Sequence, residues 1–378
     1  MDYNCVVVGS GFAGAVCARL LAEKGQKVLV VEKRDHIGGN AYDTLDENGI
    51  LIHKYGPHIF HTNKKNVYDF LSRFTEWYDY SHKVLANIYG LFVPVPFNFN
   101  SIEKAFAPEK AKALIKKLTE SYPEGSRVSI LELKKSTDAD IVELADYVYN
   151  NIFLRYTLKQ WGQKPEDIDP SVTARVPVLL SRDDRYFQDT YQGMPLEGYT
   201  KLFENMLDHE NISISLSTDV FDLISIKDNT IYVSGEAFSG DVIYTGEIDY
   251  LFNYSLGKLP YRTLSFDFET KNEEYVFPAG TINYTVNEDF TRITEFKHLT
   301  GQKCDKSTIM REYPAAFEHK DGQIPYYAII NEDNLKLYGD YKALADKIEN
   351  LHLLGRLAEY KYYNMDDIVA RALSIWEE

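Results

Sequence analysis

Apolar and polar residues at the start of the chain follow a strand, helix, strand pattern. Val6 to Val8 form a short apolar run, and apolar side chains then recur three and four residues apart from Ala13 to Leu21. Gly25 ends this helical spacing, and Val28 to Val31 form a second apolar run. Short β-branched runs indicate buried strands, and the three-and-four spacing indicates one apolar helix face. The pattern therefore predicts a βαβ unit.

Two longer segments downstream carry the helical pattern with few breakers. Residues 101–120 and 138–161 place apolar side chains three and four positions apart, which predicts an inserted helical domain. In the second segment, one helix face carries Tyr149, Phe153, Tyr156 and Gln160. An aromatic stripe at this spacing is more often core than ligand platform, so its role stays open at this point.

The remaining chain reads mostly as strands. Residues 211–330 contain short strand patterns such as "TIYVSG" and "YRTLSFDFE", which predict a mainly antiparallel sheet. Near the carboxyl end, "LHLLGRLAEYKYYNMDDIVARALSIW" predicts a strand, a Gly-Arg turn and a helix with Asn364 or Asp366 as N-cap. The predicted fold class is α/β: a Rossmann-like domain with an inserted helical domain and an antiparallel β-sheet domain.

Three glycines separate the first predicted strand from its helix. Gly9 permits a tight turn, Gly11 lets backbone N–H groups approach a pyrophosphate, and Gly14 lets helix and strand pack closely. Glu32 ends the second strand, where its carboxylate can accept hydrogen bonds from a ribose. A glycine pattern in this context is a strong indication of a dinucleotide site.

A second glycine pair, Gly38-Gly39, follows Arg34 in "EKRDHIGGN". It resembles flavoproteins with an FAD domain of the glutathione-reductase or amine-oxidase type, in which this segment runs beside the FAD pyrophosphate. The resemblance favours FAD over NAD. We expect a discontinuous FAD-binding domain at 1–80, 195–250 and 340–378, a helical substrate-lid domain at 100–170, and an antiparallel sheet domain at 81–99, 171–194 and 251–339.

Charge and cysteine content narrow the possible partners. The chain has 41 basic and 57 acidic residues, a net charge of -16, which repels nucleic acid and anionic membranes; an anionic ligand would need a local arginine cluster. Cys5, Cys17 and Cys304 lack CxxC spacing, as expected for reduced thiols. No signal-peptide pattern or apolar run near the roughly 20 residues of a membrane span is present. We predict a cytoplasmic protein without membrane insertion.

Several segments together resemble one family, the bacterial UDP-galactopyranose mutases. In chain order they are "GSGFAGAV", "RDHIGGN", "YGPHIFHT", "YTLKQWG", "YFQDTYQGMP", "GYTKLFENML", "TRITEFK", "REYP" and "GRLAEYKYYNMD". They span the chain from end to end, which is more specific than the glycine pattern alone.

The resemblance implies an isomerase that interconverts UDP-galactopyranose and UDP-galactofuranose with reduced FAD and no net oxidation. In the family mechanism, N5 of the reduced flavin attacks the anomeric carbon and displaces UDP; the adduct opens as an iminium and recloses through the other ring oxygen. The resemblance also implies a nucleotide-sugar substrate and a homodimer. NAD(P)H is a candidate external reductant.

The same resemblance assigns the substrate site. Arg175 and Arg292 match two arginines that clamp the pyrophosphate, because a planar guanidinium suits paired phosphate oxygens. Hydroxyl donors to the phosphates are expected from Tyr186, Tyr327 and Tyr362, with Tyr363 as the alternative to the last.

The uracil side of the site is assigned to one helix. Tyr156 matches the aromatic residue that stacks on uracil, with Phe153 and Thr157 in support. Trp161 matches the tryptophan of the mobile loop that closes over substrate. Glu312 in "REYP" is expected to orient groups near the sugar.

The histidines in "YGPHIFHT" receive different roles. His58 matches the histidine whose loop lies against the isoalloxazine; with Arg175 and Arg292 it is a candidate catalytic residue beside flavin N5. His61 is interpreted as structural, and no third ligand for a metal is evident nearby. The remaining expected cofactor contacts are Gly9, Gly11, Phe12, Gly14, Glu32, Lys33, Gly38, Gly39, Asn40, Ile59, Arg356 and Met365.

Three alternatives remain. The chain departs from the common family pattern at Ile152 and Asn364, so the same chemistry on an N-acetylated or deoxy nucleotide sugar stays open. A flavin-dependent oxidase or desaturase would use an apolar tunnel, against which the arginines and tyrosines argue. A non-catalytic nucleotide-binding protein is the third possibility.

Overall fold

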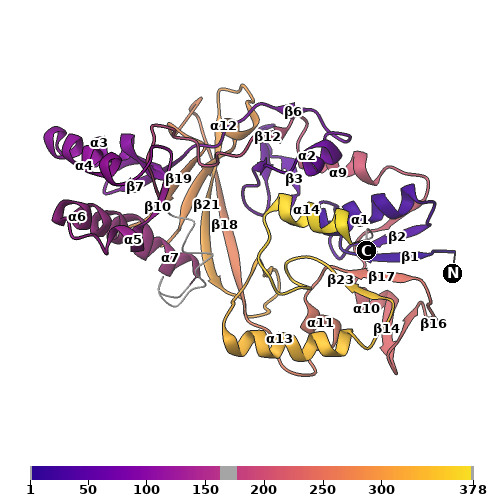
Figure 1. Ribbon diagram of the computed structural model, residues 1–378. Helices are drawn as coiled ribbons and strands as arrows, with labels where there is room; N and C mark the ends of the chain where they lie inside the picture. The colour runs from indigo at the N-terminus through magenta and orange to yellow at the C-terminus, as the bar shows by residue number, and fades with distance from the viewer. Residues whose placement is uncertain (1, 162–176, 376–378) are drawn as a thin grey trace. The chain divides into compact units, whose positions relative to one another are not determined.

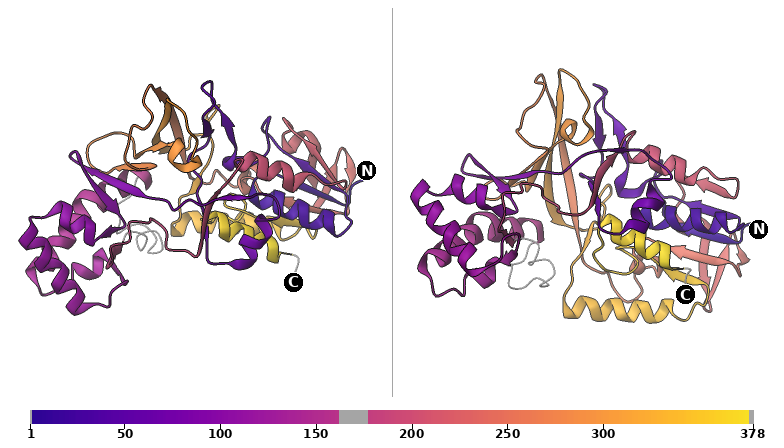
Figure 2. Two further views of the ribbon diagram at one scale, coloured as in Figure 1. Left: turned by 90° about the horizontal axis from the view of Figure 1, so that it is seen from above. Right: turned by 45° about the horizontal axis from the view of Figure 1, so that its top comes forward.

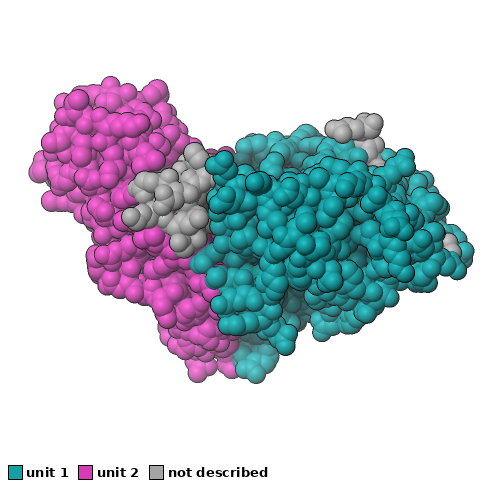
Figure 3. Space-filling view, turned by 90° about the horizontal axis from the view of Figure 1, so that it is seen from below, with its two compact units in different colours: residues 1–79, 189–263, 316–378 teal, residues 80–188, 264–315 magenta. Residues whose placement is uncertain are grey.

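The structure is a computed structural model that describes residues 2–161 and 177–375. The chain divides into two compact units, each assembled from separate stretches of sequence (Figure 3). Unit 1 comprises residues 1–79, 189–263 and 316–378, and unit 2 comprises residues 80–188 and 264–315. The two units are described separately below.

Unit 1 is built on a five-stranded parallel sheet in the order β13-β2-β1-β17-β23. Its strands are β1 (Cys5–Val8), β2 (Val28–Val31), β13 (Ile212–Ser215), β17 (Asp241–Tyr244) and β23 (Leu351–Leu353). All four pairings are parallel. Strands β1 and β2 are continuous apolar runs, as expected for a parallel sheet covered on both faces. With α1 (Phe12–Glu23) between β1 and β2, they confirm the predicted βαβ unit.

Helix α1 packs against the last helix of the chain, α14 (Met365–Ser374), and against α9 (Tyr199–Leu207). Figures 1 and 2 show α14 alongside α1. Gly25 directly follows the α1 C-cap at φ +82°, and Asn364 is the N-cap of α14, so both predicted helix boundaries are confirmed.

Smaller elements complete unit 1. Two three-stranded sheets have the orders β5-β12-β6 and β14-β15-β16, and β3 pairs with β4. The strands of these sheets are β3 (Asp43–Leu45), β4 (Leu51–His53), β5 (Phe60–Thr62), β6 (Trp77–Tyr78), β12 (Tyr191–Pro195), β14 (Ile224–Lys227), β15 (Thr230–Val233) and β16 (Glu236–Ala237). Unit 1 also contains β22 (Tyr327–Ala328), the edge strand of a larger sheet described below. The further helices are α2 (Lys65–Leu71), α10 (Val220–Leu223), α11 (Ile248–Leu251) and α13 (Glu332–Ala345).

Helix α13 contains a glycine that the fold does not require. Gly339 lies inside the helix, and a Cβ added there meets no atom within 4 Å. Because alanine loses less backbone entropy on folding, Gly339→Ala should raise the free energy of unfolding by about 0.5–1 kcal/mol. Urea unfolding of the two proteins side by side measures the difference; a less stable variant would contradict the expectation.

Unit 2 contains most of a seven-stranded sheet with the order β22-β18-β21-β20-β19-β7-β8. Its strands are β7 (Val84–Ile88), β8 (Leu91–Val95), β18 (Tyr261–Lys271), β19 (Thr281–Tyr284), β20 (Arg292–Glu295) and β21 (Ser307–Ala316). β20 is antiparallel to both β19 and β21, and β7 is antiparallel to β8, which confirms the predicted sheet. The pair β19 and β7 is parallel.

The helices of unit 2 pack around an apolar core with parts of the sheet. They are α3 (Phe99–Ala105), α4 (Pro108–Ser121), α5 (Ile130–Leu133), α6 (Ala139–Val148), a π-helical turn (Tyr149–Phe153) and α7 (Leu154–Trp161); short strands are β9 (Phe97–Asn98), β10 (Arg127–Ser129) and β11 (Pro177–Leu179), and α12 (Phe296–Thr300) follows β20. The helical segment predicted over 101–120 is confirmed, but it divides into α3 and α4: proline has no N–H to continue a helix, and Pro108 begins α4. Within the described ranges, no helix is long and apolar enough to cross a membrane.

Candidate active site

The turn between β1 and α1 has room only for glycine at two positions. Gly9 has φ +99°, and a Cβ on it would lie 2.1 Å from Thr245 Oγ1. A Cβ on Gly14 would lie 1.9 Å from the Gly9 carbonyl oxygen. Gly11, the N-cap of α1, makes no side-chain cap, so the first N–H groups of the helix suit an anion.

Glu32 lies beside this turn at the end of β2. Its Oε2 accepts hydrogen bonds from Ser10 N at 2.9 Å and Ser10 Oγ at 2.6 Å, and its Oε1 accepts one from Arg34 N at 3.0 Å. A carboxylate has about four lone-pair sites. Glu32 is thus fixed by the protein and retains capacity for a ribose hydroxyl.

The second glycine segment, Gly38-Gly39, lies against the turn between β1 and α1. A Cβ on Gly39 would lie 2.9 Å from Gly11 Cα, so the two backbones are in close contact. Asn40 Oδ1 accepts a hydrogen bond from Arg34 Nη2 at 2.7 Å. In the described part of the chain, the buried Nη1 of Arg34 has no acceptor. A cation with a spare donor beside a glycine turn fits an anionic diphosphate, as FAD would supply.

The other expected cofactor contacts have different surroundings. Lys33 is exposed, with Nζ 3.6 Å from Asp219 Oδ2. Phe12 is buried within α1, its ring 4.8 Å from that of Phe203. Ile59 is half-buried next to β5, and Met365 is the half-buried first residue of α14.

The loop that carries His58 is held from inside the protein. The His58 backbone N–H donates to Nδ1 of His53 at 3.0 Å, and His58 Nδ1 lies 2.9 Å from the Gly56 carbonyl oxygen. His53 is fully buried, and its ring meets Tyr199 edge-on at 5.6 Å. His53 could not be selected from the sequence alone, because its partner is a backbone N–H five residues away.

Burial lowers the pKa of His53 to about 3. The unfolded chain therefore takes up a proton near pH 6.5 that the folded protein does not, so stability falls as pH drops from about 6.5 toward 3. His53→Gln, which cannot titrate, should remove up to about 1.4 kcal/mol per pH unit of this slope. Unfolding free energies at pH 7, 6 and 5 give the slopes, and parallel slopes would refute the assignment.

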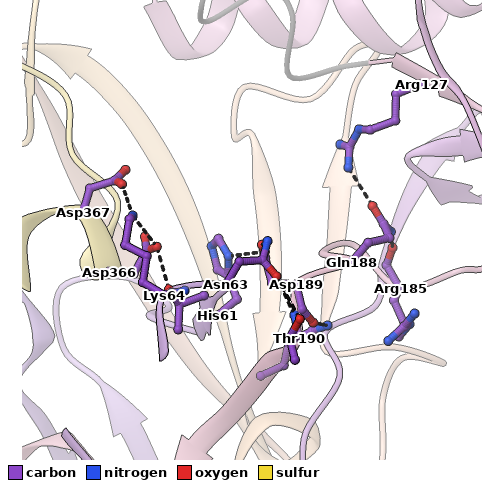
Figure 4. Close-up of polar contacts among 12 residues, drawn as sticks. His61, Asn63, Lys64, Arg127, Arg185, Gln188, Asp189, Thr190, Asp366 and Asp367 are labelled. Carbon is purple, nitrogen blue, oxygen red and sulfur yellow. Dashed lines mark hydrogen bonds and ion pairs between the residues drawn. The ribbon is translucent and has the colours of Figure 1, made fainter. Parts of the chain in front are cut away.

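His61 has a different set of partners (Figure 4). Its Nδ1 lies 2.7 Å from Asp189 Oδ2. Nearby, Asn63 contacts the same segment, because its Oδ1 accepts a hydrogen bond from the Thr190 N–H at 2.9 Å. His61 therefore ties β5 to the segment that leads into β12. Since His58 and His61 contact different groups, these contacts do not define a shared acid/base pair.

Lys64 lies next along the chain and contacts the first turn of α14 (Figure 4). Its ammonium donates to Asp366 at 2.8 Å and also pairs with Asp367, and Thr62 Oγ1 donates to Asp366 at 2.9 Å. These contacts fix the start of α14 against β5.

Three predicted site residues meet in unit 1. The rings of Tyr327 and Tyr362 are stacked at 6.1 Å, and the Arg356 guanidinium lies 4.7 Å from the centre of the Tyr362 ring. Arg356 Nε donates to the Tyr363 carbonyl oxygen at 2.7 Å. Tyr363 is itself buried, whereas Tyr362 is partly exposed. Tyr362 is thus the better placed of the two for a ligand.

Arg292 and Glu312 are paired in unit 2. They face each other across β20 and β21, and Arg292 Nε and Nη2 both donate to Glu312 Oε2, at 2.9 and 2.7 Å. Glu312 is fully buried, and the Thr291 hydroxyl lies 3.3 Å from its other oxygen. The carboxylate therefore holds one edge of the guanidinium in place.

The residues expected around uracil lie on or beside α7. Phe153 is 3% exposed and belongs to the core of unit 2, whereas Tyr156 is partly exposed and Thr157 is buried. Trp161 is the last residue of α7. Arg175 lies outside the described residues.

Tyr186, the remaining tyrosine of the expected phosphate site, is partly exposed in unit 2. Its N–H donates to the His82 carbonyl oxygen at 2.7 Å, and its ring meets that of Phe187 edge-on at 4.9 Å. These contacts fix the backbone and ring of Tyr186.

The chain is similar in sequence to known proteins over its whole length. A sequence model of the family described as UDP-galactopyranose mutase matches residues 151–362, and one of an NAD(P)-binding Rossmann-like domain matches residues 7–74. UDP-galactopyranose mutase of Mycoplasma pneumoniae is 36% identical over 100% of this chain and 96% of its own. dTDP-fucopyranose mutase of Escherichia coli is 34% identical over 97% and 96%.

Among solved structures, a reduced UDP-galactopyranose mutase superposes with a TM-score of 0.70 at 18% identity, covering 99% of this chain and 93% of the other. At this identity the superposition concerns the fold. It confirms the predicted combination of a Rossmann-like domain with a helical and a β-sheet part.

Proposed function

Because the chain belongs to the UDP-galactopyranose mutase family of isomerases, we propose that it interconverts UDP-galactopyranose and UDP-galactofuranose through a covalent adduct with N5 of reduced FAD. The observation that carries this proposal is the 36% identity to a mutase over the whole chain. The glycine turn and the Arg292–Glu312 pair supply protein groups suited to FAD and to a diphosphate.

The FAD would lie along the glycine turn. The N–H groups at the start of α1 and the Arg34 guanidinium would bind its diphosphate, and Glu32 its ribose. The His53 contact would hold the His58 loop beside the isoalloxazine. Reduced flavin bound there would supply a nucleophile for the anomeric carbon, and NAD(P)H is the candidate external source of its electrons.

The substrate would be bound through its UDP group. Arg292, with Arg175, would clamp the diphosphate, and Tyr156 would stack on uracil with Thr157 beside it. Glu312 would act through Arg292, because its carboxylate accepts two hydrogen bonds that orient the guanidinium. Hydroxyl donors to the phosphates would be Tyr186, Tyr327 and Tyr362, and Trp161 would close over the sugar.

A second candidate substrate comes from the 34% identity to dTDP-fucopyranose mutase. The chemistry would be the same, with thymine and a deoxysugar in place of uracil and galactose. Reduced protein supplied with equal concentrations of UDP-galactofuranose and dTDP-fucofuranose distinguishes them by the ratio of products. We expect the UDP sugar to be used at least about tenfold faster, a difference of about 1.4 kcal/mol in the barrier. The reverse ratio would assign the deoxysugar.

We also propose that the protein acts as a homodimer, as the family resemblance implies. Sedimentation of the flavin-loaded protein at micromolar concentration tests this directly. A single species of monomer mass would remove the proposal and leave the assigned chemistry unaffected.

A further inference from the structure

Lys159 of α7 binds both ends of the connection between β19 and β20. Its ammonium donates to the carbonyl oxygen of Tyr284 at 2.8 Å and to that of Phe290 at 3.4 Å. Tyr284 is the last residue of β19, and Arg292, two residues beyond Phe290, is the first residue of β20. One side chain of α7 thus reaches the hairpin that carries Arg292.

Contacts within the hairpin fix the position of Arg292 relative to the connection that Lys159 binds. The Tyr284 N–H donates to the Thr291 carbonyl oxygen at 2.8 Å, and the rings of Tyr284 and Phe290 meet edge-on at 4.7 Å. Asn283 and Arg292 are direct cross-strand partners. A shift of the two carbonyl groups that Lys159 binds would therefore shift Arg292 as well.

Holding an ammonium in this position has a cost. Lys159 is half-buried, and the loss of water lowers its pKa. Among the charged groups around it, Glu288 and Asp289 favour the ammonium form, and Arg155 opposes it. The two carbonyl contacts offset the lost hydration, since hydrogen bonds from a charged donor are the stronger kind.

We infer that Lys159 is a positioning residue: it ties the helix carrying Tyr156 to the strand carrying Arg292, and so sets the distance between the uracil and diphosphate subsites. The inference rests on the proposed function, which assigns these two subsites. UDP fills both and gains affinity when their spacing is fixed in advance, whereas uridine uses only the helix. Loss of Lys159 should therefore weaken UDP selectively.

The test uses the full-length flavin-loaded protein and calorimetric titration with UDP and with uridine. In Lys159→Met, which keeps the length and loses the charge, the Kd for UDP should rise about tenfold and that for uridine by less than about twofold. Lys159→Arg should recover most of the UDP affinity. The matched control is Arg155→Met: Arg155 reaches the same hairpin at Asn287 Oδ1, 3.2 Å, but is exposed, and both Kd values should stay within about twofold.

Two results would overturn the inference. Unchanged UDP affinity in Lys159→Met would show that the hairpin needs no such tie, and equal weakening of UDP and uridine would show a general loss of α7 structure. Failure of the proposed function gives a distinct result, because the wild-type protein would then not bind UDP, and this inference would fall with it.

Discussion

Replacing Arg292 by alanine should lower kcat/KM for UDP-galactofuranose by about 10²–10⁴-fold while flavin stays bound. The magnitude corresponds to two charge-assisted hydrogen bonds to the diphosphate, at about 1.5–3 kcal/mol each. Arg292 belongs to unit 2, whereas the glycine turn belongs to unit 1, so flavin absorbance in the purified variant should remain. Initial rates with the reduced protein provide the measurement.

The alanine variant also leaves Glu312 buried without its guanidinium partner, which by itself destabilises a protein. The double variant Arg292→Ala/Glu312→Gln removes this charge and separates the two effects. A matched control is Arg311→Ala: Arg311 precedes Glu312 on β21, so its side chain points to the opposite face, where it pairs with Asp267 and Glu269. Activity should survive in that control. Near-wild-type activity in Arg292→Ala would show that the diphosphate is bound elsewhere.

Alanine at Gly11 and alanine at Gly14 should both remove flavin, for different reasons. At Gly11 the nearest atom to an added Cβ is Gly39 Cα at 3.7 Å, an ordinary contact, so Gly11→Ala should fold. Its methyl group would lie where the diphosphate approaches the backbone, and we expect the Kd for FAD to rise at least about 100-fold. Flavin retained on desalting reports this loss.

Gly14→Ala instead disrupts the protein itself. The added Cβ would lie 1.9 Å from the Gly9 carbonyl oxygen and 3.0 Å from Val7 Cγ1, so strand and helix must separate. We expect a loss of about 3 kcal/mol or more in unfolding free energy, beyond the usual cost of overpacking. A thermal unfolding scan of both variants distinguishes the two cases. Normal flavin content in Gly11→Ala would contradict the assigned role of the turn.

The βαβ unit and its glycine turn could be predicted because they depend on local signals. Apolar runs define β1 and β2, and Gly9 and Gly14 lie at the positions where the backbone has no room for a Cβ. The break before α4 had a signal as well: Pro108 cannot continue a helix, but the long helical spacing around it obscured this.

Other features of the site could not be read from the chain, because their partners are distant in sequence or belong to the backbone. Lys159 contacts carbonyl groups about 130 residues downstream. The aromatic stripe divides in the structure: Tyr149 and Phe153 belong to the core of unit 2, whereas Tyr156 is partly exposed. Helical spacing alone cannot make this division, since the π-helical turn at Tyr149–Phe153 changes the spacing along the face.

The most direct test of the proposed mutase activity is chromatographic. The flavin-loaded protein is incubated with UDP-galactofuranose, once oxidised and once reduced with dithionite, and the products are separated. We expect UDP-galactopyranose to form only with the reduced protein. No conversion by the reduced protein, or equal conversion by the oxidised one, would contradict an isomerase that acts through reduced FAD.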